Sequence, residues 1–237
     1  MIVEVLFNEV CGLSGDSQNA EFLQAAMPEA EFVYTTLLED PRFVHEDVDM
    51  LLMGSMEEGI QRRVLEKLRS HKARLLELID RGVPFLATGN AGEIFLKDIH
   101  YITEGIQVSG LGFFDLQVKT DLFNRYNAKV LGTLDGIEIV GYRSQFSFWY
   151  GDNSQNYFLK CDRGEGIHKG SKLEGVRRNN LICTQILGPI LPLNPLFCEY
   201  FLRLAGVDAP APFRDAAMEA YALRLKEFKD PKMLFNV

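Results

Sequence analysis

Short buried strands alternate with helices through the first part of this chain, and this alternation constrains its fold most. The strands are nearly continuous apolar runs, which are typical of parallel strands buried on both faces. They cover residues 2–7, 31–35, 49–53 and 85–88. Between the last two, residues 57–81 repeat apolar residues at helical spacing up to Gly82, which predicts one long helix. The pattern predicts an α/β fold with a mostly parallel central sheet flanked by helices.

From Gly110 onward the pattern changes to shorter strands bounded by Gly, Asn and Asp. We expect them at residues 113–119, 128–131, 137–142, 146–150 and 157–160. A further apolar strand at 181–187 precedes a proline-rich turn and a helix at 196–205, which Pro195 opens. The sequence contains no internal repeat. We therefore expect one domain over residues 1–237, with 210–237 forming a C-terminal helical extension.

The charge balance excludes several classes of function. The chain has 33 acidic and 25 basic residues, a net charge of −8, and a pI near 5.1. Nucleic acid and anionic membranes both attract a positive face, so neither is an expected partner. No apolar run approaches the roughly 18–20 residues of a membrane span, and the N-terminus lacks the basic region of a signal peptide. Four scattered cysteines without metal spacing indicate a reduced, cytoplasmic protein. We expect neither a metal nor a cofactor.

The most informative local segment is Ala87–Thr88–Gly89–Asn90–Ala91, where a buried strand turns into a helix expected from about Ala91. A nucleophile elbow has this form, with small residues two positions before and after the nucleophile. Its central position, where a Ser or Cys would attack, is Gly89. A plain glycine-containing strand–helix turn explains the segment equally well.

Several segments, in order and spacing, resemble one enzyme family. They are Asp49–Gly54 followed by Glu57, Glu58 and Gln61; Gly82–Ala87; Gly110–Gly112; Ile139–Tyr142; and Gly188–Asn194. Together they resemble a class I glutamine amidotransferase domain, of the subgroup of cobyric acid synthases and the glutaminase subunit of lipid II isoglutaminyl synthase. The resemblance implies a three-layer, flavodoxin-like fold and glutamine hydrolysis by a cysteine–histidine pair.

The chain departs from that family where the chemistry occurs. The resemblance places Gly89 at the nucleophilic cysteine and Leu187 at the catalytic histidine. A thiolate must form the glutamyl thioester and an imidazole must keep it ionised, and neither residue can do this. Other family positions change as well. In the oxyanion loop, Ser55 and Met56 replace the glycines expected after Gly54, and Asn90 follows the elbow position. Asn124, beside Arg125, stands where a substrate-binding arginine is expected. We expect these eight residues to line a degenerate pocket.

Other residues could take over catalysis. Cys11, in a loop on the site side, is a candidate relocated nucleophile, whereas Cys183 should lie below the site in a strand. Four acids, Asp16, Glu57, Glu58 and Glu93, could gather at the carboxyl edge of the sheet, although stabilisation of helix starts explains them equally well.

The aromatic segment Phe146–Tyr150 could cover a core face, form an interaction surface, or plug the old pocket. We expect this segment and Met56 to fill part of the cleft. If the cleft stays open, backbone amides at 90–91 could bind an anion.

Two functional hypotheses follow. In the first, the chain has lost glutaminase activity and is a binding or regulatory subunit. The resemblance implies a Mur-ligase-like synthetase as its partner, in amidation of a peptidoglycan precursor. In the second, it is an active amidotransferase or amidohydrolase that uses a relocated nucleophile such as Cys11.

Overall fold

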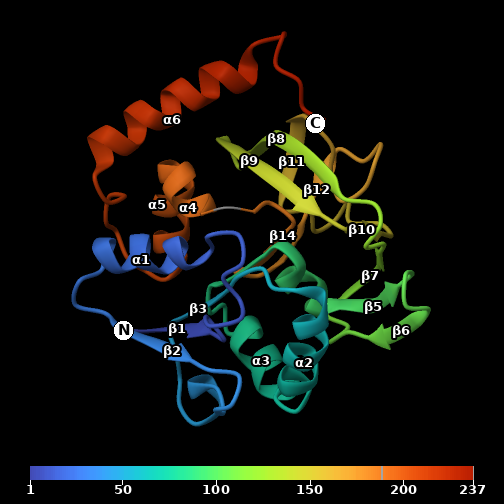
Figure 1. The fold of residues 1–237 in the computed structure, drawn as a ribbon. Helices are drawn as coiled ribbons and strands as arrows, with labels where there is room; N and C mark the ends of the chain where they lie inside the picture. The colour runs from blue at the N-terminus through green and yellow to red at the C-terminus, as the bar shows by residue number, and fades with distance from the viewer. Residues whose placement is uncertain (188, 237) are drawn as a thin grey trace.

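A six-stranded sheet lies at the centre of the computed structural model, which describes residues 1–187 and 189–236 (Figure 1). The strand order is β13–β14–β4–β3–β1–β2. The strands are β1 (Ile2–Leu6), β2 (Glu31–Thr35), β3 (Met50–Met53), β4 (Phe85–Thr88), β13 (Val176–Arg178) and β14 (Leu181–Thr184). All neighbours are parallel except β13 and β14. The predicted mostly parallel α/β fold is confirmed, and β3, β4 and β14 are neighbours, as expected.

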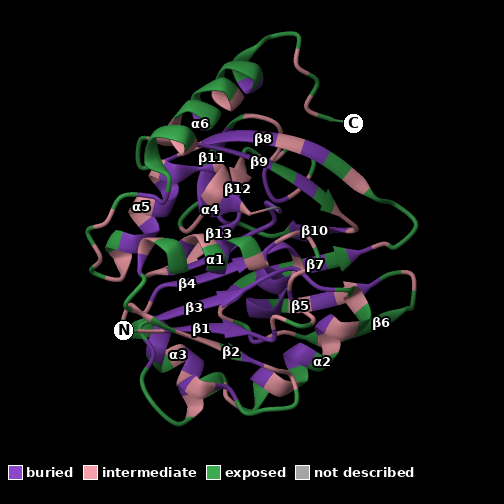
Figure 2. Ribbon diagram, turned by 60° about the vertical axis from the view of Figure 1, so that its left-hand side comes forward, coloured by how far each residue is buried: buried purple, intermediate pink, exposed green. Residues whose placement is uncertain are grey.

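Helices cover both faces of this sheet. They are α1 (Ser17–Ala26), α2 (Glu58–Arg69), α3 (Lys72–Asp80), α4 (Ile190–Leu193) and α5 (Pro195–Leu204). In β3, Leu51 and Met53 belong to the apolar cluster of α2 and α3. Met50 and Leu52 belong to the cluster of α1, α4 and α5. This alternation buries the strand on both faces, as its continuous apolar run predicts (Figure 2).

The helix predicted over residues 57–81 is two helices. A turn at Ser70 and His71 separates α2 from α3, and the amide of His71 donates to the carbonyl of Leu68 at 2.9 Å. Leu68 and Leu75, on either side of the turn, are both fully buried. The apolar spacing continues through the turn, which is why the sequence pattern alone does not reveal it.

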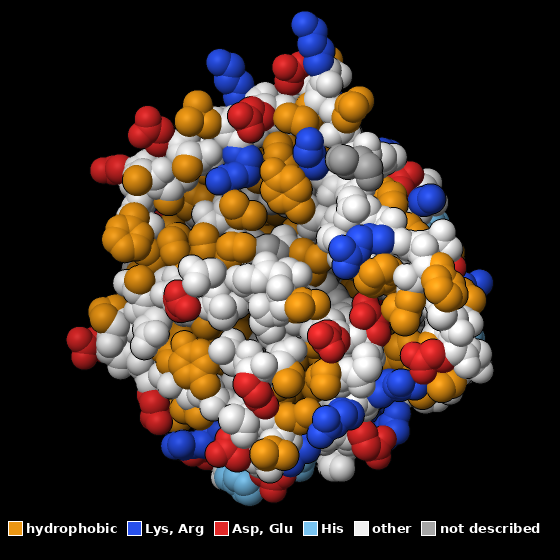
Figure 3. Space-filling view, viewed as in Figure 1, with side chains coloured by type: hydrophobic (Ala, Val, Ile, Leu, Met, Phe, Trp, Pro, Cys, Tyr) orange, Lys and Arg blue, Asp and Glu red, His pale blue; other side chains and the backbone are white. Residues whose placement is uncertain are grey.

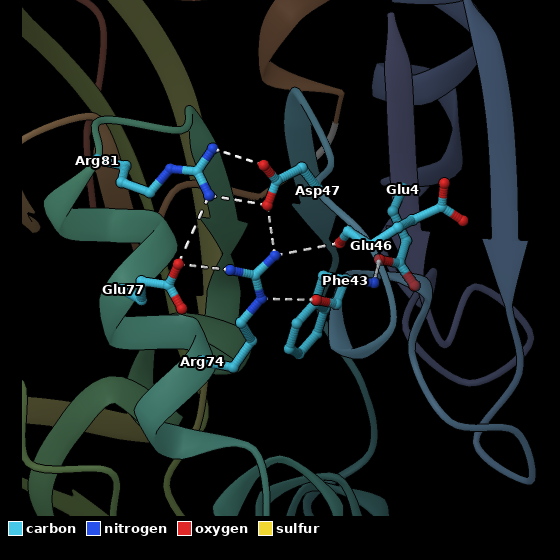
Figure 4. Close-up of polar contacts among 7 residues, drawn as sticks. All are labelled: Glu4, Phe43, Glu46, Asp47, Arg74, Glu77 and Arg81. Carbon is cyan, nitrogen blue, oxygen red and sulfur yellow. Dashed lines mark hydrogen bonds and ion pairs between the residues drawn. The ribbon is translucent and has the colours of Figure 1, made fainter.

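A polar network ties the connection between β2 and β3 to α3 (Figure 4). Asp47 accepts hydrogen bonds from Arg74 at 2.6 Å and from Arg81 at 2.8 Å. These two guanidinium groups hold the pKa of Asp47 well below its usual range. Arg74 also donates to the carbonyl of Phe43, whose own amide donates to the buried carboxylate of Glu4 at 2.9 Å. The connection, which includes the 3₁₀ turn η1 (Arg42–Val44), is thus fixed to the sheet and to α3.

The helix expected from about Ala91 is not formed. Gly89–Phe95 is instead a seven-residue 3₁₀ helix, η2, and the strand β5 (Leu96–Tyr101) follows directly. Gly89 and Gly92 disfavour a regular α-helix. Every residue of Ala91–Leu96 is buried, so this segment packs as an irregular core turn rather than as an amphipathic helix.

The second half of the chain forms two four-stranded sheets, in the orders β10–β7–β5–β6 and β12–β11–β8–β9. Their remaining strands are β6 (Ile106–Ser109), β7 (Phe114–Thr120), β8 (Tyr126–Leu134), β9 (Ile137–Gln145), β10 (Ser147–Tyr150), β11 (Leu159–Arg163) and β12 (Leu173–Glu174). The predicted strands of this region are present in longer, shorter or shifted form, and the strand predicted at 181–187 ends at Thr184. Strands β5, β6, β12 and β13 were not predicted. The first of these sheets is joined to the carboxyl end of β4 through η2, which contacts both β4 and β5.

The last helix, α6 (Arg214–Lys229), lies at the outer side of the second small sheet (Figure 1). The hydroxyl of Tyr221 donates to the carbonyl of Glu138 in β9 at 2.6 Å, and Phe228 packs with Leu131 and Val140. In the described part of the chain, no helix combines the length and hydrophobicity needed to cross a membrane. Gly188, in the segment that resembles the amidotransferases, lies outside the described residues.

Candidate functional site

The turn after β4 has the geometry of an elbow but no side chain at its apex. Gly89 follows Thr88, the last residue of β4, with a φ of +59°, a conformation that glycine adopts without strain. A Cβ atom placed on Gly89 would lie 2.5 Å from Leu187 Cδ2 and 2.7 Å from Ser55 Cβ. Leu187 therefore occupies the space directly above Gly89, and the expectation that the two residues meet is confirmed.

A cavity of about 270 Å³ opens beside this turn. Of the eight predicted pocket residues, six line it: Ser55, Met56, Gly89, Asn90, Arg125 and Leu187. Gly54 packs inward instead, since a Cβ there would lie 2.2 Å from the carbonyl oxygen of Cys11. Asn124 is exposed, and its amide donates to Asp121 at 2.6 Å rather than facing the cavity. The prediction that these two residues line the pocket is wrong.

The loop after β3 is held by side chains on two other segments. The buried carboxylate of Asp16 accepts hydrogen bonds from the Ser55 amide at 3.0 Å and from the Ser55 hydroxyl at 2.6 Å. It also accepts one from Thr88 at 2.6 Å. The Met56 amide donates to Asn90 Oδ1 at 2.9 Å, and Asn90 Nδ2 donates back to the Met56 carbonyl at 2.7 Å. Both loop amides nearest the elbow are therefore engaged within the protein.

Three of the four acids that sequence placed near the sheet edge do line the cavity: Glu57, Glu58 and Glu93. Glu93 is the unusual one, because it is only 1% exposed. Its carboxylate accepts hydrogen bonds from Gln61 at 2.8 Å, from Trp149 Nε1 at 3.3 Å and from the hydroxyl of Ser147. No Lys or Arg pairs with it among the described residues, and burial raises its pKa to about 7. A carboxyl group with such a pKa exchanges protons near neutral pH.

A second polar cluster backs the far wall of the cavity and was not predicted. Arg143, in β9, is almost fully buried and donates to Gln145 at 3.0 Å, to the carbonyl of Glu165 at 2.9 Å, and to Gln185. The backbone amide of Gln185 in turn donates to the buried carboxylate of Glu174 at 2.8 Å. The only sequence signal was an arginine at an inward position of an alternating strand. These side chains satisfy one another, so we regard them as the support of the wall.

The expectation that apolar groups fill the cleft is partly right. Leu187 covers Gly89, and Phe146 lines the rim. Met56 lines the cavity too, but it is 1% exposed, and its sulfur lies 3.8 Å from Cys11 Sγ. Trp149 is buried behind η2, against the space beside Gly92. Much of the cleft therefore stays open. Because η2 is a short 3₁₀ turn, the α-helix N-terminus at which an anion could have bound is not formed.

The thiols are poor nucleophiles. Cys11 is 2% exposed and does not line the cavity above Gly89. Burial, helped by the nearby carboxylates of Glu9 and Asp16, raises its pKa to about 12. Burial likewise raises the pKa of Cys183 well above its usual value. Within residues 1–187 and 189–236, no group of His, Cys, Asp and Glu is arranged to hold a metal ion.

Comparison with known proteins identifies related chains, although no family model matches. Over 174 residues the chain is 29% identical to the lipid II isoglutaminyl synthase (glutamine-hydrolyzing) subunit GatD of Staphylococcus aureus, covering 71% of this chain and 68% of that one. Among solved structures, it is similar to a glutamine amidotransferase (TM-score 0.53, 19% identity), over 87% of this chain and all of that one. A second is PurLQS from Thermotoga maritima (TM-score 0.53, 12% identity), over 94% and 98%.

The two structural likenesses agree with the observed arrangement of a parallel sheet between helix layers, with an elbow after its central strand β4. The sequence likeness spans most of the same chain. On these grounds, the chain has the fold of the class I glutamine amidotransferases, and its sequence is similar to that of the GatD subunit.

Proposed function

We propose that this protein has lost glutaminase activity and acts as a non-catalytic subunit. The main observation that supports this proposal is the contact at the elbow, where Leu187 fills the space that a nucleophilic side chain on residue 89 would need. Glycine supplies no thiol, and leucine neither accepts nor donates a proton. The deficit is steric as well as chemical, because a side chain at residue 89 requires Leu187 and Ser55 to move.

The loop after β3 supports the same proposal. Acyl transfer needs backbone amides that are free to bind the oxyanion, one from the loop after the third strand and one just after the nucleophile. Here the Ser55 amide is bound to Asp16 and the Met56 amide to Asn90. A glutamine carbonyl would have to displace one of these acceptors. Removing such donors typically costs a factor of about 10²–10³ in rate.

The alternative, an enzyme that uses Cys11, has little physical support. A thiol with a pKa near 12 is almost entirely protonated at neutral pH. It is also separated from the cavity above Gly89, whose lining does not include it.

The name of the Staphylococcus aureus relative, a subunit of lipid II isoglutaminyl synthase, suggests the kind of partner. We place this chain in the cytoplasm, on a Mur-ligase-like synthetase that amidates a peptidoglycan precursor. In that role it would contribute binding or regulation rather than ammonia.

Co-expression with the Mur-ligase-like synthetase of the same genome tests the role. We expect the two chains to co-elute in size-exclusion chromatography, and the complex to amidate its substrate with ammonium chloride but not with glutamine. Amidation driven by glutamine, with this chain as the only amidotransferase present, would overturn the loss of activity. Failure to co-elute would overturn the partner assignment alone.

A further inference from the structure

Aromatic rings covered by basic side chains gather on the outward side of β7 and β10, at the start of β8 and in the loop between β11 and β12. We call this surface the cation–aromatic face, and it consists of Lys119, Tyr126, Phe148, Tyr150, His168 and Lys169. Lys119 Nζ lies 5.0 Å from the ring centroid of Tyr150, and the His168 ring stacks on the same tyrosine at 5.4 Å. Lys169 Nζ lies 5.6 Å from the ring centroid of Tyr126 and 5.9 Å from that of Phe148. Each ring therefore holds a basic group in place.

The same arrangement continues toward the cavity. Arg125 lies 4.8 Å over the ring of Phe146, two residues before Phe148, and both residues line the cavity. Figure 3 shows Lys and Arg side chains beside hydrophobic ones on the side of the molecule where β7 and β10 lie. The face is thus continuous with the rim of the candidate site.

Among the described residues, neither the two lysines of this face nor the neighbouring Arg125 has an acidic partner. Within the described residues, Lys119, Lys169 and Arg125 form none of the ion pairs of the chain, although most other arginines do. The carboxylate of Glu165 also lies at this face, where it accepts hydrogen bonds from the Tyr126 hydroxyl at 2.7 Å and from the Gly170 amide. On a chain of net charge −8, these three basic groups therefore remain free to pair with an anionic group of another molecule.

We propose that the cation–aromatic face docks an extended, acidic segment of a partner protein. The inference rests on the proposed role as a subunit and identifies the surface that this role uses. Alternate residues of a strand repeat every ~6.6 Å, so acidic residues at every second position of an extended segment match the spacing of Phe146, Phe148 and Tyr150. Because the rings already hold the cations, little side-chain freedom is lost when the segment binds.

Single-stranded nucleic acid fits this face less well than an acidic polypeptide. Such ligands bind by stacking bases on open aromatic faces. Here His168 and Lys119 cover Tyr150, and Lys169 covers Phe148. The net charge of −8 also repels a polyphosphate.

Three fluorescein-labelled dodecamers test the proposal with the full chain, by anisotropy: alternating Glu-Thr, alternating Lys-Thr, and oligo-dT. We expect the Glu-Thr peptide to bind and the Lys-Thr peptide not to bind. Raising the salt from about 50 to 300 mM should weaken binding several-fold, because the contacts are exposed charges. The Lys119→Glu/Lys169→Glu variant should lose at least tenfold in affinity.

A matched control reverses two exposed lysines elsewhere, Lys226→Glu/Lys232→Glu, and should bind the Glu-Thr peptide as the parent chain does. Circular dichroism melts establish that each variant is folded. No binding of the Glu-Thr peptide, equal losses in both variants, or tighter binding of oligo-dT would each overturn the proposal. The assay uses neither glutamine nor the synthetase, so its outcome is independent of the tests of the proposed function.

Discussion

Replacing the buried carboxyl of Glu93 by an amide should change the pH dependence of stability. Glu93 is 1% exposed, and desolvation raises its pKa from an ordinary 4.5 to about 7, against the opposing hydrogen bonds from Ser147, Gln61 and Trp149. Each pKa unit corresponds to about 1.4 kcal/mol, so ionisation of Glu93 costs the folded state about 3 kcal/mol.

The sign follows from proton binding. Because the pKa is higher in the folded chain, that state binds more protons than the unfolded chain between about pH 4.5 and 7. The contribution of Glu93 to stability therefore falls as the pH rises through this interval and stays low above it. The Glu93→Gln variant cannot ionise, so it does not lose this stability as the pH rises. Its side-chain NH₂ group, however, faces another donor, Gln61 Nε2, which costs about 1 kcal/mol. We expect the variant to be about 1 kcal/mol less stable below about pH 4, nearly as stable as the parent chain near pH 5, and about 2 kcal/mol more stable at pH 8.

Urea unfolding at pH 5, 6, 7 and 8 measures this difference. Trp149 is the only tryptophan of the chain, and its indole nitrogen lies 3.3 Å from Glu93, so its fluorescence reports both unfolding and the local environment. The exposed Glu57→Gln on the same cavity is the matched control and should follow the parent chain. Burial also raises the pKa values of Glu4 and Glu174. Both residues are present in the parent chain and in the variant, so their contributions to the pH dependence cancel in the difference. Parallel pH profiles for the parent chain and Glu93→Gln would refute the reasoning.

Further predictions concern the elbow and its loop. Gly89→Ala should cost about 2–4 kcal/mol, from its positive φ and the clash with Leu187, and less in a Leu187→Ala background. Urea-unfolding cycles check this, and strictly additive costs would contradict it. Asp16→Ala should cost about 2–3 kcal/mol because Ser55 and Thr88 lose their acceptor, visible as a lowered Tm; an unchanged Tm would count against that role. Gly89→Cys/Leu187→His should still release almost no ammonia from glutamine, because the amides of the loop remain engaged; robust turnover in an ammonia assay would disprove this.

Much of the central sheet could be predicted from sequence. The bounds of β2 and β4 agree with the predicted 31–35 and 85–88, because continuous apolar runs between turn residues have no other stable placement. The meeting of Gly89 and Leu187 was also predictable, since parallel strands bring their carboxyl ends to one edge.

Other features depend on tertiary contacts that no local pattern encodes. The segment Ala91–Leu96 is apolar enough for a helix, but its packing on all sides makes it a short 3₁₀ turn that leads into β5. From the sequence, Glu93 was interpreted as an acid at a helix start. In the structure it is a buried residue of the cavity wall, and its carboxylate accepts hydrogen bonds from side chains of α2 and β10. Asn124 and Gly54 were assigned to the pocket by position, and hydrogen bonding or close packing directs them elsewhere.

The central claim is that the pocket above Gly89 does not hydrolyse glutamine. Its most direct test is ammonia release from glutamine by the purified full chain, measured with a glutamate dehydrogenase-coupled assay beside the heat-denatured protein. We predict equal signals for the native chain, the denatured chain and Cys11→Ala, because Gly89 offers no nucleophile and the Cys11 thiol stays protonated. A rate that co-purifies with the native chain and vanishes in Cys11→Ala would contradict the account.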